Sequence, residues 1–181
     1  MFGILDGVVI GAIFSLLLII KVVSTPHVAF LGRIPGTNRY TDNARHHDNE
    51  IIPGVLLVRV ESPLLYFNVN NIHKTIWNKV LLEEKTLKIV ILDLSTSAYI
   101  DSSGATFIKG LFLELKVRGV SFRIAEAHSE VRDILRIEEI EHLFGHVGRR
   151  DSVQDVVSVA IEEHALIVSD AKKDFPEQPN S

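Results

Sequence analysis

An uncharged apolar stretch near the N-terminus constrains this chain most, because such a stretch is unstable in water unless something covers it. It runs from Gly7 to Ile20. As a helix it is roughly 21 Å long, whereas the hydrocarbon core of a bilayer is about 30 Å thick. Extension to residues 1–23 gives about 34 Å and adds Asp6 and Lys21, each near an end where a charge reaches the interface. The sequence therefore predicts a transmembrane helix over residues 1–23.

A signal peptide and a buried core helix are the two alternatives for this stretch. A signal peptide needs a basic segment before the apolar run and a small-residue cleavage site after it. Here Asp6 precedes the run without any Lys or Arg, and residues 24–27 contain no Ala-x-Ala. A buried core helix is the second alternative, because apolarity and length fit it as well. The transmembrane helix is the favoured interpretation.

The charges that flank the apolar stretch predict its orientation. Lys21, Arg33, Arg39 and Arg45 follow it, and only Asp6 precedes it. Basic residues are enriched on the cytoplasmic side of membrane spans. We therefore expect a bacterial inner-membrane or plasma-membrane protein whose long C-terminal part is cytoplasmic.

Composition limits the remaining function classes. The 181 residues suffice for one domain of ordinary size with short extensions. Nineteen basic and 23 acidic residues give a net charge of −4, which does not favour a nucleic-acid partner. The chain has no Cys, which excludes disulfides, thiolate metal sites and a cysteine nucleophile.

Residues 24–53 are polar and rich in Pro, Gly, Asn and Asp, and this composition predicts an ordered linker from the membrane to a domain. The domain is expected over residues 54–167 and a disordered tail over residues 168–181. We expect residues 51–167 to fold without the apolar helix.

Apolar periodicity within the domain predicts alternating strands and helices. The strands are expected at residues 55–60, 64–67, 87–92 and 120–125. The helices are expected at residues 68–82, with Asn68 as a candidate cap, and at residues 103–118, 129–144 and 152–167. The expected fold class is α/β, with a mixed, largely parallel sheet and about four helices after one transmembrane helix.

The tetrapeptide formed by Asp101, Ser102, Ser103 and Gly104 lies between an expected strand and an expected helix. The free N–H groups and the dipole of a helix N-terminus favour an anion at such a turn. A serine here is a natural N-cap and could also accept a phosphate. From the residues alone, a simple helix cap with a tight turn remains the alternative to a regulatory loop.

The segment from Ile91 to Gly104, together with the order of elements from residue 55 to about residue 165, resembles the STAS domain. That domain is shared by bacterial anti-sigma-factor antagonists and the cytoplasmic tails of SulP anion transporters. In the antagonists the second Ser of this motif is phosphorylated. The resemblance therefore implies Ser103 as a phosphorylation site, within a regulatory loop over Asp101–Gly104.

Other segments are similar to the SulP branch. They are residues 26–37 and 40–42, directly after the apolar helix, then residues 50–54 and residues 63–68. The resemblance implies the last membrane span and the STAS domain of a SulP sulfate or anion transporter. One span does not conduct anions alone. The chain is therefore expected to be a C-terminal fragment, the product of a truncated or split gene, or a tail that acts with another chain.

Several patterns that suggest chemistry are set aside. His46, His47 and Asp48 lie in a polar segment without a third metal ligand at recognisable spacing. Ser102 and Ser103 do not lie in a G-x-S-x-G motif. The chain has no P-loop and no G-x-G-x-x-G motif. We therefore expect no enzyme, no catalytic residues, no metal and no cofactor.

The leading functional hypothesis is a cytoplasmic regulatory and interaction domain of a SulP-type transporter. Its expected partners are the membrane, the remaining membrane domain and a cytosolic regulatory protein or kinase, with homo-oligomers formed through the transporter. The alternative is a membrane-tethered signalling module of the antagonist type that phosphorylation of Ser103 switches. The identity of the anion is not encoded in this part of a transporter.

Overall fold

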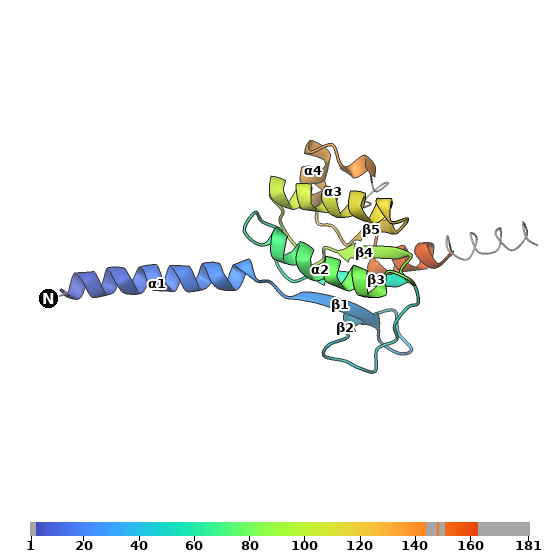
Figure 1. Ribbon diagram of the computed structural model, residues 1–181, viewed down its shortest axis with the longest axis horizontal. Helices are drawn as coiled ribbons and strands as arrows, with labels where there is room; N and C mark the ends of the chain where they lie inside the picture. The colour runs from blue at the N-terminus through green and yellow to red at the C-terminus, as the bar shows by residue number, and fades with distance from the viewer. Residues whose placement is uncertain (1–2, 144–147, 149–150, 163–181) are drawn as a thin grey trace, which may run out of the picture.

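The computed structural model describes residues 3–143, 148 and 151–162. The first helix, α1 (Ile4–Ser24), extends away from the rest of the protein (Figure 1), and none of its residues is buried. By length and composition α1 is able to cross a membrane. Because no residue of α1 is buried against the domain, the structure does not support a buried core helix. The candidate membrane span of the sequence analysis is retained.

Five strands form one mixed sheet in the order β2-β1-β3-β4-β5. They are β1 (Val28–Arg33), β2 (Tyr40–Asp42), β3 (Val55–Val60), β4 (Ile89–Asp93) and β5 (Ser121–Ala125). β3, β4 and β5 are parallel to one another, whereas β1 is antiparallel to both of its neighbours. The expected α/β class with a mixed sheet is confirmed.

Helices cover both faces of this sheet in the described part of the chain. They are α2 (Val69–Glu83), α3 (Ser102–Val117), α4 (Ser129–Ile137), the short 3-10 helix η1 (Glu141–Leu143) and a helix over residues 153–162. α2, α3 and α4 share one apolar core with alternate residues of β4, including Val90 and Leu92. The helix over residues 153–162 packs in the other core, with Ile89 and Ile91. β4 is therefore covered on both sides, as its continuous apolar run indicates.

The segment expected as a linker is corrected by the structure, because β1 and β2 lie within residues 24–53. Val28 pairs with Val60, the last residue of β3. Ala29 and Leu31 are buried in the core that includes Leu57. The turn-forming residues do form turns, including one at Gly36 (φ 71°). The strands between these turns are too short to give a clear apolar pattern in the sequence. The sheet therefore begins at Val28.

The strand expected at residues 64–67 is also wrong. Only Leu64 makes a bridge, with Ile100, and residues 66–68 form a turn. The side-chain oxygen of Asn68 accepts from the Leu65 N–H (2.9 Å), and its amide donates to the Pro63 carbonyl (2.9 Å). Asn68 therefore stabilises the preceding turn and does not cap α2 with its side chain.

The helix expected at residues 129–144 is shorter than predicted. α4 ends at Ile137, and Glu139 adopts a left-handed conformation (φ 53°) before η1. The expected end at residue 144 lies outside the described residues. So do residues 163–167 of the last expected helix and the whole expected tail, residues 168–181.

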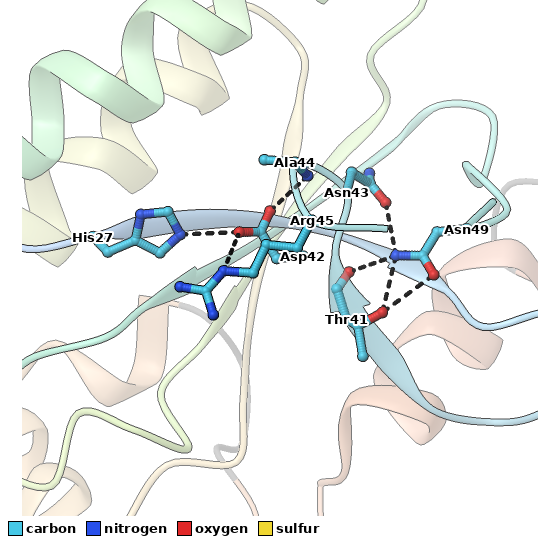
Figure 2. A network of polar contacts seen from close by, with 7 residues as sticks. All are labelled: His27, Thr41, Asp42, Asn43, Ala44, Arg45 and Asn49. Atoms are coloured by element: carbon cyan, nitrogen blue, oxygen red, sulfur yellow. Dashed lines mark hydrogen bonds and ion pairs between the residues drawn. The ribbon is translucent and has the colours of Figure 1, made fainter. Parts of the chain in front are cut away.

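A polar network fixes the chain where it leaves α1 (Figure 2). His27 Nε2 lies 3.0 Å from Asp42 Oδ2, which connects the residue before β1 to the end of β2. Asp42 Oδ1 also accepts from the Ala44 N–H (2.9 Å), and Arg45 Nε lies 3.9 Å from Oδ2. Burial alone would raise the pKa of Asp42, but the Ala44 N–H, His27 and Arg45 together hold it below its ordinary value.

This lowered pKa predicts a loss of stability in acid. Ionised Asp42 stabilises the fold above its unfolded pKa of about 3.9, and the stabilisation is lost as the pH falls through the lower folded pKa. We expect the melting temperature to fall less in Asp42→Asn than in the wild type between about pH 5 and pH 2. Circular dichroism melts measure this. Asp48→Asn is the control, because Asp48 is exposed and makes no ion pair among the described residues; an equal pH dependence in all three proteins would contradict the assignment.

The place of β1 and β2 in the sheet predicts the boundary of the folding unit. A piece that starts at Ile51 loses Ala29, Leu31 and Tyr40 from the core and leaves one edge of β3 unpaired. Each large apolar side chain contributes about 1.5–3 kcal/mol, against a typical total stability of about 5–15 kcal/mol. We expect a piece that starts at His27 to melt cooperatively and the shorter piece to melt much lower or without cooperativity. Equal melting temperatures would show that β1 and β2 are not part of this unit.

Candidate functional site

The loop that follows β4 crosses the carboxyl edge of the parallel strands and leads into α3. Two backbone hydrogen bonds hold its end against Leu64: the Leu64 N–H donates to the Tyr99 carbonyl (3.1 Å), and the Asp101 N–H donates to the Leu64 carbonyl (3.1 Å). The loop is therefore attached to the turn before α2 as well as to its own strand.

Asp101 is the N-cap of α3, a role that the sequence analysis assigned to a serine. Its Oδ1 accepts from the Gly104 N–H (2.8 Å), and its Oδ2 accepts from the Tyr66 N–H (2.9 Å). Among the described residues, the N–H groups of Ser102 and Ser103 have no acceptor. Ser102 is exposed and Ser103 is half-buried. The two serines thus occupy the first turn of α3, beside free backbone donors.

Gly104 permits the close approach of α3 to the turn before α2. A Cβ atom at this position would lie 2.5 Å from the Leu64 carbonyl oxygen and 2.9 Å from the Leu64 Cβ. Gly104 and Leu64 are both fully buried or nearly so, with little room for either to move. The glycine of the motif is therefore required by backbone packing.

A groove of about 500 Å³ separates α2 from α3 beside this loop. It is lined by Tyr66, Val69, Asn70, His73, Ser102, Ser103, Thr106, Phe107, Gly110 and Glu114. The groove brings both serines of the motif together with hydroxyl, amide, imidazole and carboxylate groups. Such a lining suits a polar or charged side chain of a partner.

His73 and Glu114 form an imidazole–carboxylate pair in the groove, and no sequence motif points to either residue. His73 Nε2 lies 2.8 Å from Glu114 Oε2. The imidazole stacks on Trp77, with ring centroids 5.8 Å apart, and meets the edge of Phe107 at 6.2 Å. The pair joins α2 to α3, but no local spacing connects residues so far apart in sequence. The two residues meet only because the fold turns the helix faces that carry them toward each other.

The described residues offer little for catalysis. No group of three or more His, Cys, Asp or Glu side chains is placed to hold a metal ion in this part of the chain. His46, His47 and Asp48 are exposed, as expected for a solvated segment. No side-chain base forms a hydrogen bond with the hydroxyl of Ser102 or Ser103 among the described residues.

Comparison with known proteins identifies the family. The model of the STAS domain matches residues 46–156. Probable sulfate transporter 4.2 of Arabidopsis thaliana is 33% identical over 169 residues, which cover 88% of this chain and 25% of that protein. The chloroplastic sulfate transporter 4.1 of the same plant is 29% identical, again over 25% of its length. The chain thus spans about a quarter of these transporters.

Solved structures share the fold. The murine Solute Carrier 26 family member A9 anion transporter matches with a TM-score of 0.74 at 22% identity, over 86% of this chain and 25% of the transporter. The STAS domain of a SulP transporter from Vibrio cholerae matches with a TM-score of 0.53 at 21% identity, over 68% of this chain and 93% of that domain. Because the model of the STAS domain matches more than half of the residues of this chain, the chain belongs to the STAS domain family.

Proposed function

We propose that this chain comprises the last membrane span and the cytoplasmic STAS domain of a SulP-type anion transporter, and that the domain regulates transport without conducting anions itself. The extent of the similarity to sulfate transporters carries this proposal. A match over 88% of the chain takes in the end of α1, both strands of the expected linker and the STAS region. The relatives therefore resemble this chain across the junction between membrane and domain as well as within the domain.

The regulatory surface in this proposal is the loop Asp101–Gly104 with the groove between α2 and α3. A phosphate on Ser103 adds about −1.5 to −2 charges at the first turn of α3. The free N–H groups and the helix dipole attract that charge, and the Asp101 carboxylate repels it. Because this attraction and this repulsion oppose each other, we expect the fold to survive phosphorylation. The added charge then acts on the partner that binds at the groove. A cytosolic regulatory protein or a kinase is the proposed partner.

Orientation is the first test. With α1 across the membrane and the basic residues after it inside, a reporter fused after Ser181 is expected to be active only in the cytoplasm. Alkaline phosphatase and green fluorescent protein fusions report the two sides in complementary ways. Phosphatase activity outside the cytoplasm would show that the orientation is the opposite of the one proposed. Recovery of the fusion in the soluble fraction would show that α1 does not span the membrane.

The regulatory role is tested in a chimera in which this chain replaces the matching quarter of probable sulfate transporter 4.2. Ser103→Asp is expected to change sulfate uptake while it leaves the melting temperature of the domain within a few degrees of the parent. Ser103→Ala is expected to abolish any kinase-dependent part of the change. Ser121→Asp is the matched control, because Ser121 is an exposed serine at the start of β5, away from the groove.

Three outcomes of this experiment separate the alternatives. Unchanged uptake and unchanged partner binding in both Ser103 variants would leave the motif as a helix cap only. Loss of folding in either variant would make the role of Ser103 structural. Altered binding of a soluble partner without any change in uptake would favour the membrane-tethered signalling module.

A further inference from the structure

The sheet register places one end of the domain directly beside the end of α1. Val28, at the start of β1, pairs with Val60, at the carboxyl end of β3. The Glu61 N–H donates to the His27 carbonyl (3.0 Å), and the side-chain amide of Asn71 donates to the Ser24 carbonyl (2.9 Å). The carboxyl end of β3 and the first turn of α2 therefore lie next to the end of α1 (Figure 1).

Three exposed aromatic side chains are carried by the loops at this end. Tyr66, Phe67 and Tyr99 are 77%, 44% and 46% exposed. The loops that carry them are joined by the hydrogen bond from the Leu64 N–H to the Tyr99 carbonyl. One helical turn separates Phe67 from Asn71, the residue that contacts the end of α1. We call these three residues the aromatic edge.

The chemistry of the aromatic edge suits the boundary between lipid and water. Tyr combines an apolar ring with a polar hydroxyl, and aromatic residues are enriched at the level of the lipid headgroups. The edge lies close to a helix that is able to cross the membrane. We propose that Tyr66, Phe67 and Tyr99 lie in the headgroup layer of the membrane that α1 crosses, so that this end of the domain rests on lipid.

The proposal has a consequence for the groove. Tyr66 also lines the groove that contains Ser102 and Ser103. With Tyr66 in the headgroup layer, one end of the groove lies at the membrane surface, and a cytosolic partner reaches the serines along that surface. The inference itself rests only on α1 as a membrane span and not on phosphorylation of Ser103.

The absence of cysteine from the chain permits a direct test. The full chain carries a nitroxide on a single introduced Cys and is reconstituted in phosphatidylcholine nanodiscs. Collisions with oxygen, which concentrates in lipid, and with a water-soluble nickel chelate are measured by spin resonance. Leu82→Cys is the matched control for Tyr66→Cys: Leu82 is 81% exposed and lies at the other end of α2. Phe14→Cys reports on the span.

We expect the ratio of oxygen collisions to nickel-chelate collisions to be highest at Phe14→Cys, intermediate at Tyr66→Cys and lowest at Leu82→Cys. Equal ratios at Tyr66→Cys and Leu82→Cys would overturn the proposal, because the edge would then be in water. A label at Tyr66→Cys that neither reagent reaches would also overturn it, in favour of contact with protein. A Phe14→Cys label that oxygen does not favour would show instead that α1 is not in lipid. Fluorescence of Trp77 in each unlabelled variant verifies the fold.

Discussion

Burial of β4 on both faces is the constraint on which the rest of the domain depends. All five of its residues are buried, so each face of the sheet needs apolar cover next to this strand. α2 and α3 supply the cover on one face, and the helix over residues 153–162 supplies it on the other. The parallel pairs on both sides of β4 then bring the carboxyl ends of three strands to one edge. The candidate site lies at that edge.

The loop that presents the serines is held firmly where it leaves β4. Asp93 is fully buried. Its Oδ2 lies 2.7 Å from Nη2 of Arg59 in β3, and its Oδ1 accepts from the Ser95 N–H (2.8 Å). Ser97, also fully buried, donates from its hydroxyl to the Val60 carbonyl (3.1 Å) or to the Ser62 carbonyl (2.8 Å). Buried polar groups that are fully paired specify one arrangement of their segment. The loop that carries the serines is therefore held in one arrangement. Such a loop suits a surface whose charge a modification changes while the domain stays folded.

The contacts at the end of α1 link this helix to the groove. Asn71 binds the last carbonyl of α1, and α2 carries both Asn71 and His73. His73 in turn pairs with Glu114 across the groove. These contacts connect the end of α1 to the helix that lines the groove.

The sequence by itself determined the apolar helix that is able to cross a membrane, the α/β class, the strands around the core and the position of the loop, because these follow from apolar periodicity and turn residues that are local. It did not determine that β1 and β2 belong to the sheet, since their pairing with β3 depends on register between distant segments. Nor did it determine the use of Asn68, Asp101 and His73, whose partners are brought close only by the fold. The tertiary structure alone decided that the carboxyl end of β3 and the first turn of α2 lie beside the end of α1, because the antiparallel pairing of β1 with β3 turns that end of the sheet toward it.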